Sequence, residues 1–515
     1  MKKIHILLAA FLATAGLASC DMEKYPYNSV EESQYMTQLG DFQAARYGIY
    51  SNYRGLTTGG YILNTEMQAD NFYATVDYGN YFGYFYRWDI QTGNGDIESM
   101  WSGYYSTIAR CNYYIDGYQR VVDGTVTGFT EENMTEIGSY AAEAYFTRAF
   151  CYYNLAVLFC HPYDASTASS EMGLPLQLTY SPSSDASTYP GRSSLADTYA
   201  QINSDLSEAS RLLQGLYALN SNATNALYYI TPDAITALQA RVALQMKDYN
   251  TAISASTALI NSGEYALVSD AATYRGIWEE DNGAETIWQI YMSNPNELGN
   301  PTGLYFHGQY GTTPQRPSYY PSQTVIDMYD QENDIRFAAF FMPFTYEAST
   351  GASGAIYKFD KYPGNPTMGL STDDHYINMS KPFRIAEQYL IAAEAYLESG
   401  NTTEATNYLN TLCSNRIAGY AGLSSSSTES LRSAIREERN KELIGEGFRL
   451  ADLKRWGLGV DRGNNAQNDD LTFGVGLSNG TSLTVSADDY RFTWPIPQAE
   501  MDVNPQLRGQ QNPGY

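Results

Sequence analysis

The sequence predicts a mainly α-helical protein: a tetratricopeptide-like scaffold of helical pairs with long loop excursions and a few short strands. Apolar residues recur at helical spacing with little interruption over residues 97–262. Alanine-rich helix pairs recur at 231–263 and 384–415, and such a pair is the unit of a tetratricopeptide-type repeat. Glycine- and proline-rich or polar stretches, which predict loops, lie at 164–193, 293–323 and 460–490.

The first predicted helices carry apolar stripes. Residues from Ile97 to Ile115 place large apolar side chains on one face, and alanines alternate with aromatic residues over 133–160. A third stripe covers 195–213. Ser194 and Asp197 form the pattern of a capping box, which places the start of this helix near residue 195.

The helix pair at 231–263 has clear boundaries. Thr231-Pro232 is typical of a helix start, Lys247-Asp248 separates two stripes, and Gly263 ends the second. Arg384–Leu397 and Thr403–Asn415 repeat this arrangement around a short turn. With the helix at 133–160, three or four such pairs are expected, which is about the minimum for a stacked core.

A lipoprotein signal is predicted at the N-terminus. Two lysines precede an apolar run from Ile6 to Leu17, and small residues come just before Cys20. Such a stretch is typical of a secretory signal, so we expect residues 1–19 to be removed and Cys20 to be acylated. Two or more acyl chains anchor a protein stably, because each buried methylene contributes roughly 0.8 kcal/mol.

The charge balance excludes one class of partner. The formal net charge is −26, and removal of the signal, with Lys2 and Lys3, makes the mature chain still more acidic. So acidic a chain repels phosphate backbones, which excludes nucleic acid. No other apolar run approaches the ~18 residues of a spanning helix, so we expect the lipid alone to hold the chain at a membrane.

Catalytic and metal-binding patterns are scarce. The chain contains no H-E-x-x-H, G-x-S-x-G, P-loop or paired C-x-x-C motif, and no two histidines have metal-ligand spacing. We therefore expect no catalytic residue, no metal and no cofactor. The cysteines at 111, 151, 160 and 413 lack paired spacing and are predicted to be buried free thiols.

The densest charge pattern lies at 436–457. Glu438, Glu442 and Glu446 follow one another at four-residue spacing, a row that is unfavourable on a helix unless cations face it. Arginines of the same segment are the expected partners. A catalytic carboxylate is the alternative, but structural networks pair carboxylates in the same way. The predicted structural ion-pair network comprises Glu438, Arg439, Glu442, Glu446, Arg449, Asp452 and Arg455.

This segment resembles the C-terminal signature of the SusD/RagB family of Bacteroidetes outer-membrane lipoproteins. The matching residues run from Glu438-Arg439 to Arg455-Trp456-Gly457, and the tail from Trp494 to Tyr515 is similar to that family's ending. Upstream, the segments similar to its helical core are Trp101–Asn112, Glu143–Phe150 and Ala237–Tyr249. The resemblance covers essentially the whole mature chain.

The resemblance implies one domain over 20–515, with a helical repeat core at about 31–262 and 380–460 and a loop-rich ligand-binding excursion at about 265–380. It implies a binding protein, not an enzyme, that hands an oligosaccharide to a SusC-like TonB-dependent transporter. Asp21 and Glu23 are similar to the family's export signal. The implied location is the outer membrane, lipid-anchored and facing the exterior.

Two aromatic segments, 72–88 and 305–320, are the predicted ligand-binding loops. Sugars stack their C–H faces on exposed rings, and a few polar side chains fix their hydroxyls. Alternatively, 81–88 is a strand with inward-facing aromatics, and Ile277–Tyr291 is expected to be a buried strand. The candidate contacts are Tyr78, Asn80, Tyr81, Tyr84, Trp88, Tyr305, Gln309, Tyr310, Arg316 and Tyr319.

Three other functions remain open from the sequence. The RagB branch of the same family implies a peptide ligand instead of a glycan. Acidic residues are numerous enough to supply the carboxylate pair of a glycoside hydrolase. Helical repeats are also the scaffold of proteins that bind only other proteins.

Overall fold

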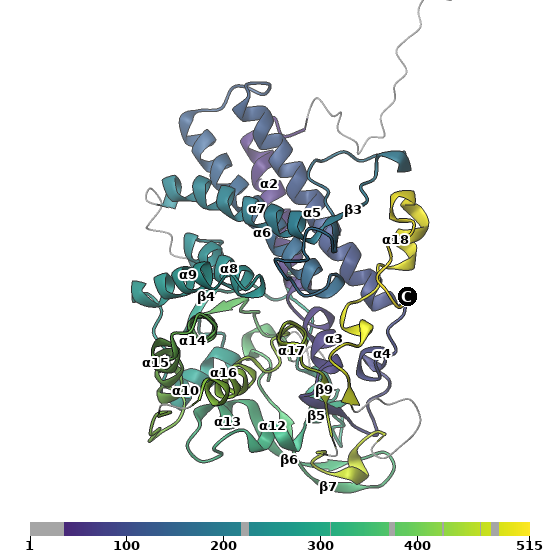
Figure 1. The fold of residues 1–515 in the computed structure, drawn as a ribbon, viewed down its shortest axis with the longest axis vertical. Coiled ribbons are helices and arrows are strands. Elements are labelled where there is room, and N and C mark those ends of the chain that lie inside the picture. The colour runs from purple at the N-terminus through teal and green to yellow at the C-terminus, as the bar shows by residue number, and fades with distance from the viewer. Residues whose placement is uncertain are drawn as a thin grey trace, which may run out of the picture.

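A computed structural model of the chain confirms the mainly helical class (Figure 1). It describes residues 35–217, 226–309, 311–369, 376–424, 427–463, 465–474 and 484–515. The predicted signal and Cys20 lie outside these residues. Within the described part of the chain, no helix is long and apolar enough to cross a membrane.

Long helices form the upper part of the molecule in Figure 1. They are α2 (Leu39–Leu56), α5 (Gly95–Val122), α6 (Glu131–Phe159) and α7 (Leu195–Tyr217). α6 packs against α2, α5 and α7, which makes it the centre of this bundle. The Asn94 side chain accepts hydrogen bonds from the backbone N–H groups of Asp96 (2.9 Å) and Ile97 (3.2 Å), so α5 begins there.

Helix pairs continue the stack below the bundle. They are α8 (Pro232–Gln245) with α9 (Tyr249–Ser262), and α14 (Ile385–Glu398) with α15 (Thr402–Ser414). α14 also contacts α16 (Thr428–Leu443) and both helices of the first pair. Ala243, Ala252 and Ala395 meet in one buried cluster, because small side chains let the helices approach closely. The predicted pairs are confirmed.

The boundary residues act as the sequence indicates. The Thr231 hydroxyl accepts a hydrogen bond from the backbone N–H of Ala234 (3.2 Å), with Pro232 in the first turn of α8. Gly263 ends α9 with φ = 74°, a left-handed conformation that glycine adopts without strain.

Strands are short and pair antiparallel, two to a sheet. The pairs are β1 (Phe72–Ala74) with β5 (Tyr319–Pro321), β2 (Met172–Pro175) with β3 (Arg192–Ser194), β4 (Thr286–Trp288) with β8 (Phe383–Arg384), β6 (Phe341–Glu347) with β7 (Ser353–Phe359), and β9 (Val460–Asp461) with β10 (Thr484–Val485). The β6–β7 hairpin lies at the lower end of the molecule in Figure 1.

The other α-helices in the described part of the chain are short. They are α3 (Gly60–Gln68), α4 (Gly83–Tyr86), α10 (Ala271–Glu279), α11 (Leu304–His307), α12 (Gln323–Asp327), α13 (Ile335–Phe340), α17 (Arg449–Trp456) and α18 (Gln498–Val503).

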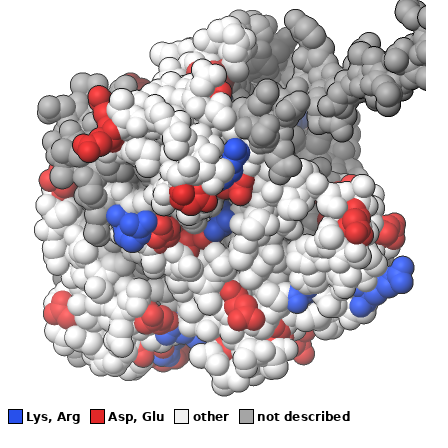
Figure 2. Space-filling model, turned by 90° about the horizontal axis from the view of Figure 1, so that it is seen from above, with Lys and Arg blue, Asp and Glu red and all other residues white. Residues whose placement is uncertain are grey.

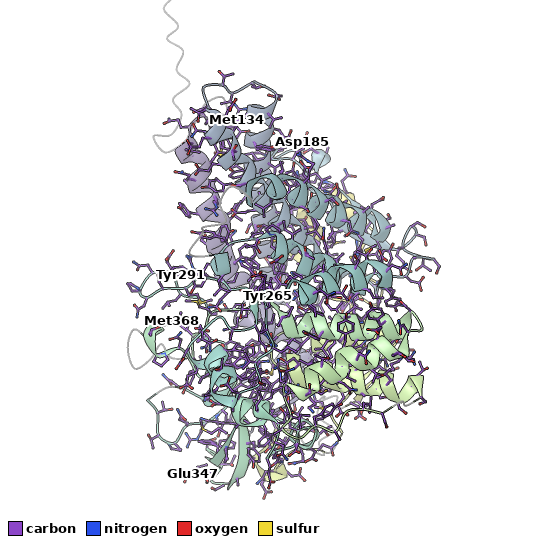
Figure 3. The ribbon with its side chains drawn as sticks, turned by 90° about the vertical axis from the view of Figure 1, so that its left-hand side faces the viewer. Met134, Asp185, Tyr265, Tyr291, Glu347 and Met368 are labelled. Carbon is purple, nitrogen blue, oxygen red and sulfur yellow. The ribbon has the colours of Figure 1, made fainter. Side chains whose placement is uncertain are left out.

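The buried strand expected over 277–291 is largely wrong. Trp278 belongs to α10, because the Asp270 carboxylate caps that helix by accepting from the backbone N–H of Thr273 (2.8 Å). Trp278 and Trp288 are buried as expected, but only Thr286–Trp288 is a strand. Tyr291 is 47% exposed and lies at the edge of the molecule in Figure 3.

The C-terminal tail packs against the N-terminal bundle. Trp494 is fully buried, and its indole N–H donates to the Gln68 side chain (2.8 Å). The Asn512 side chain donates to the carbonyl of Phe159 at the end of α6 (2.8 Å). The four described cysteines, at positions 111, 151, 160 and 413, are buried free thiols.

Candidate ligand-binding surface and buried ion pairs

The two aromatic segments predicted to bind a ligand are brought together by one short sheet. β1 pairs with β5 so that Phe72 faces Pro321 and Ala74 faces Tyr319. The chain leaving β1 then lies beside the chain that enters β5. As a result, rings from 72–88 and from 305–320 share one surface, although more than 200 residues separate the two segments in the sequence.

In the described part of these segments three tyrosines are not buried; we call them the aromatic surface. Tyr81 and Tyr84 are 54% and 46% exposed, and Tyr305 is partly exposed. The Tyr305 ring lies 5.2 Å from that of Tyr81 and 4.6 Å from that of Phe82, measured between centroids. The half-buried Phe82 packs edge-to-face against Tyr305, and it is absent from the predicted set.

Backbone strain is concentrated in the loop that carries this surface. Asn80, Phe82 and Trp88 have φ values of 62°, 53° and 57°, a region that non-glycine residues rarely adopt. Such residues persist only where their surroundings fix them. The Arg87 guanidinium does so here, donating to the Tyr78 hydroxyl (2.7 Å) and to the Asn80 side-chain oxygen (2.6 Å).

Three predicted contacts are buried and therefore do not form part of the surface. Trp88 is 0% exposed, and its indole N–H donates to the carbonyl of Gln68 (2.8 Å). Tyr319 is also 0% exposed, and its hydroxyl donates to the carbonyl of Tyr81 (2.5 Å). Tyr78 packs against Phe473 in the core. These rings were predicted as contacts from composition alone, but their apolar area is used for packing.

The predicted polar contacts are accessible where the structure describes them. Asn80 and Gln309 are exposed, and Tyr310 lies outside the described residues. Arg316 has a side chain 42% exposed, with its guanidinium 3.6 Å from the Asp77 carboxylate. Neutral amides and one arginine in the same two segments as the open rings are groups that can bind hydroxyls.

Asp77 connects the aromatic segment to the β6–β7 hairpin, and the sequence did not indicate this role. Its carboxylate accepts from the Tyr346 hydroxyl (2.7 Å) and from the backbone N–H of Ser349 (2.9 Å). Partial burial alone would raise the pKa of Asp77, but hydrogen bonds from Ser349 and Tyr346, together with Arg316, lower it below its usual value. Glu347, at the end of β6, marks this end of the molecule in Figure 3.

The acidic row of the C-terminal segment is buried among cations. Glu442 accepts from Arg384 (2.8 Å), Arg416 (2.9 Å) and Arg336 (3.1 Å). Ion pairs connect five cations and five carboxylates into one cluster without net charge. The members of this buried ion cluster are Arg336, Lys361, Arg384, Arg416, Lys441, Glu285, Asp334, Glu438, Glu442 and Glu446.

The expected arginine partners of this row are wrong. The arginines that face the row come from other parts of the chain, and the local cation is Lys441, 3.5 Å from Glu438, whereas the three local arginines bind other carboxylates. α16 also ends at Leu443, so Glu446 lies in the following turn and not on the helix. Arg439 pairs with Asp452 (2.8 Å), Arg449 with Asp70 (2.7 Å), and Arg455 with Asp452 (2.9 Å) and Glu394.

Neighbouring cations lower the pKa values of Glu438, Glu442 and Glu446. Burial alone would raise the pKa of Glu442, but the guanidiniums of Arg416, Arg384 and Arg336 hold that pKa well below its usual value. The pKa values of Glu438 and Glu446 are lowered by neighbouring cations in the same way, against the effect of burial. The row therefore stays charged and joins α16 to its neighbours.

Charge on the outside of the molecule is scattered. On the face seen in Figure 2, lysine and arginine side chains are isolated or lie beside acidic ones, and no continuous basic surface forms. The same chain is acidic overall, with a formal net charge of −26. This face offers no site of the kind that binds a phosphate backbone.

Two family models match the chain. The model described as "SusD family" matches residues 345–515, and the model described as "Starch-binding associating with outer membrane" matches residues 34–244. The first match contains the ion-pair segment. The second contains the helical bundle, β1 and the loop that carries Tyr81 and Tyr84.

Relatives of full length are also found. SusD-like protein P38 of Formosa agariphila is 24% identical and aligns over 100% of this chain and 99% of its own. A solved SusD superfamily protein of Bacteroides thetaiotaomicron is 28% identical, with a TM-score of 0.76 over 92% of this chain and 100% of the other. Surface glycan-binding protein A of Bacteroides fluxus shares the fold at 21% identity, with a TM-score of 0.68 over 93% and 100% of the two chains.

Proposed function

Because the chain belongs to the SusD/RagB family, we propose that it is an outer-membrane lipoprotein that captures an oligosaccharide and delivers it to a SusC-like TonB-dependent transporter. The observation that carries the glycan part of this proposal is the aromatic surface. Tyr81 and Tyr84 expose about half of each side chain in a loop whose conformation is strained and fixed.

The geometry of this surface suits a sugar chain. Open rings offer flat apolar faces to the C–H groups of a pyranose, and adjoining exposed rings, unlike single ones, are typical of a binding surface. Asn80, Gln309 and Arg316 lie in the same two segments and can accept or donate hydrogen bonds to hydroxyls. An open surface can bind part of a long chain without enclosing its ends.

We propose binding without turnover. The densest group of carboxylates, in the buried ion cluster, is held in ion pairs with cations. A carboxylate whose pKa is held below its usual value does not serve as the general acid of a glycosidase, which needs a raised pKa. Membrane attachment through Cys20 and exposure to the exterior complete the proposal and rest on the sequence and the family.

A glycan-binding screen tests the proposal. The soluble chain from Asp21 onward retains every described residue and can be applied to immobilised and free oligosaccharides. Replacing Tyr81 and Tyr84 together by alanine should weaken binding at least tenfold, since each stacked ring contributes about 0.5–1.5 kcal/mol beyond its buried area. Tyr47→Ala is the matched control, because Tyr47 is 62% exposed but lies on α2.

The outcomes separate the alternatives. Binding of peptides and of no glycan would replace the proposal by peptide uptake of the RagB kind. Release of shorter sugars from a bound oligosaccharide would show a hydrolase. Co-purification with a transporter, unaffected by any sugar and by the tyrosine substitutions, would indicate a scaffold that binds only protein.

A further inference from the structure

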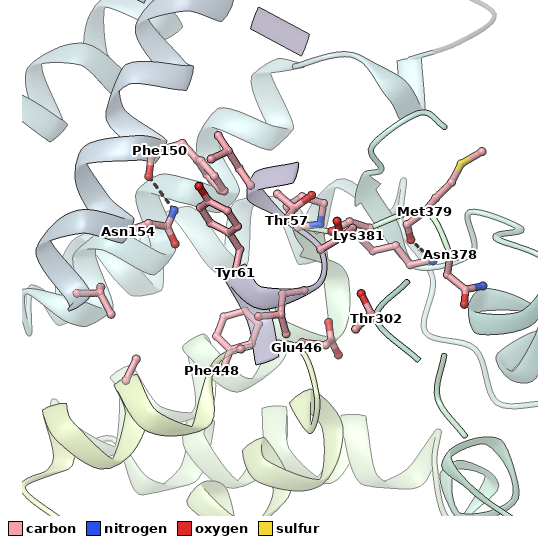
Figure 4. A pocket seen from close by; sticks show the side chains of 18 of the residues that line it. Thr57, Tyr61, Phe150, Asn154, Thr302, Asn378, Met379, Lys381, Glu446 and Phe448 are labelled. Atoms are coloured by element: carbon pink, nitrogen blue, oxygen red, sulfur yellow. Dashed lines mark hydrogen bonds between the residues drawn. The ribbon is translucent and has the colours of Figure 1, made fainter. Parts of the chain in front are cut away.

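A cleft separates the N-terminal helices from the C-terminal turn that follows α16 (Figure 4). Its volume is about 130 Å³. In Figure 4, Tyr61 of α3 lies between Asn154 of α6 and Phe448, and Thr302 and Lys381 lie on the other side. A smaller cavity of about 50 Å³ adjoins it, since both are lined by Tyr61, Tyr104 and Asn154.

Polar groups without partners line this cleft. Tyr104 and Tyr153 are 3% and 8% exposed, and neither hydroxyl has a hydrogen-bond partner within the described parts of the chain. The Asn154 side-chain N–H donates to the carbonyl of Phe150 (2.8 Å), which leaves its oxygen without a partner among the same residues. These three polar atoms are not among the fully buried ones, so they face the cleft and are available to water or to a ligand.

The charged groups that line the cleft are already neutralised. Each charged residue on the wall of the larger cleft is held by a buried partner of opposite charge, so an ionic ligand there would have to break an existing pair. A neutral ligand has no such cost. The pairs are Arg241 with Glu387 (2.6 Å), Lys381 with Asp281 (2.7 Å) and Glu446 with Lys361 (2.7 Å). Lys454 lines only the adjoining cavity, where its ammonium donates to the carbonyls of Val157 (2.8 Å) and Cys160 (2.6 Å).

The size and walls of the cleft limit the ligand further. At about 10–15 Å³ for each water, 130 Å³ accommodates on the order of ten water molecules. This is enough space for one sugar ring. The rings of Tyr61 and Phe448 supply apolar walls, and Thr57 and Thr302 add further hydroxyls.

We propose that this cleft is a second, internal binding site for one neutral sugar ring, separate from the aromatic surface. The ring stacks against Tyr61 or Phe448 and hydrogen-bonds to the Tyr104 and Tyr153 hydroxyls and the Asn154 oxygen. The site shares no lining residue with the aromatic surface, so it does not depend on the function proposed above.

Saturation-transfer difference NMR on the soluble chain tests this site. The probes are glucose, galactose and mannose, with glucuronate as the charged counterpart. Tyr153→Phe removes one hydroxyl, and Asn154→Leu removes the free oxygen at similar volume. Tyr81→Ala, on the aromatic surface, is the matched control. Circular dichroism and the midpoint of thermal unfolding verify that each variant folds.

At least one neutral sugar should give a saturation-transfer signal with the wild type. The same sugar should raise the midpoint of thermal unfolding of the wild type. Its affinity should fall about tenfold in Tyr153→Phe and in Asn154→Leu, because each leaves a ligand hydroxyl unpaired, and should persist in Tyr81→Ala. If Asn154→Leu fails to fold, Tyr153→Phe decides. Absence of a signal from every neutral sugar, loss of the signal in Tyr81→Ala, or equal binding of glucuronate would overturn the proposal.

Discussion

Replacing Glu442 by glutamine should destabilise the protein strongly. Glu442 is 0% exposed and accepts hydrogen bonds from three guanidiniums, those of Arg336, Arg384 and Arg416, at 2.8–3.1 Å. Glutamine keeps the shape but removes the charge. The buried ion cluster, balanced at five cations and five carboxylates, then carries one uncompensated positive charge.

The expected loss is about 3–5 kcal/mol of the free energy of unfolding. Removing one partner of a buried ion pair costs this much because the remaining charge has already lost its water. A stable domain has only about 5–15 kcal/mol in total. The substitution should therefore shift the folded population by several orders of magnitude.

Urea unfolding at pH 7, followed by circular dichroism, measures this loss as a lower midpoint at an unchanged slope. Glu429→Gln is the matched control on the same helix. Its side chain is 74% exposed and pairs with Arg432 (2.6 Å), so the expected loss is below about 1 kcal/mol. Equal, small losses in the two variants would refute the reasoning.

The pH dependence has a defined sign. The folded-state pKa of Glu442 lies well below its usual value, so its stabilisation is present above the unfolded pKa of about 4.5 and is lost as the pH falls. The wild type should therefore lose stability on acidification more steeply than Glu442→Gln. Parallel pH profiles would contradict the assignment.

Two further substitutions test particular positions. Burial raises the pKa of Glu66 to about 7, so ionisation of this carboxyl lowers the stability of the folded state as the pH rises from about 4.5 to 7. Glu66→Gln keeps an acceptor for the backbone N–H of Gly447 (2.7 Å) and cannot ionise. The variant should therefore unfold at a higher midpoint than the wild type at pH 8 and at the same midpoint at pH 4. A midpoint unchanged at pH 8 would count against a charged, buried Glu66. Gly83→Ala should weaken glycan binding at least about tenfold, measured as a binding isotherm. The Cβ of the new alanine would lie 2.1 Å from the Asn80 side-chain oxygen and would displace the strained loop. Gly95→Ala, whose Cβ meets no atom within 4 Å, should bind as the wild type does, and equal binding by both variants would show that the loop conformation is unimportant.

Local signals made the helices predictable. Thr231-Pro232 and Gly263 act through neighbouring backbone groups, so sequence spacing alone contains their effect. The cap at Asp270 is equally local, but the aromatic, β-branched content of the residues after it favoured a strand. That competition explains why Trp278 was assigned to a strand while its burial was predicted correctly.

The partners of the buried glutamates could not be predicted, because they lie far from them in the sequence. The row at Glu438, Glu442 and Glu446 required cations, but nothing in the sequence selects Arg336, Arg384 and Arg416 over nearer arginines. The internal cleft shows the same limit, because its walls come from segments hundreds of residues apart.

The aromatic segments combine both cases. Their composition indicated a ligand surface, yet Tyr81 and Trp88 are equally plausible contacts until the fold is known. Trp88 is buried because its indole reaches the carbonyl of Gln68 on α3 (2.8 Å), whereas the ring of Tyr81 is left outside by the turn at Asn80. Composition therefore pointed to these two segments, and packing decided which of their rings are exposed.

A crystal structure of the soluble chain with an oligosaccharide identified by the glycan screen tests the central claim most directly. The account predicts electron density for a sugar stacked on Tyr81, Tyr84 or Tyr305, with hydroxyls near Asn80, Gln309 or Arg316. Density for the oligosaccharide on any other part of the molecule, with these rings still open to solvent, would contradict it.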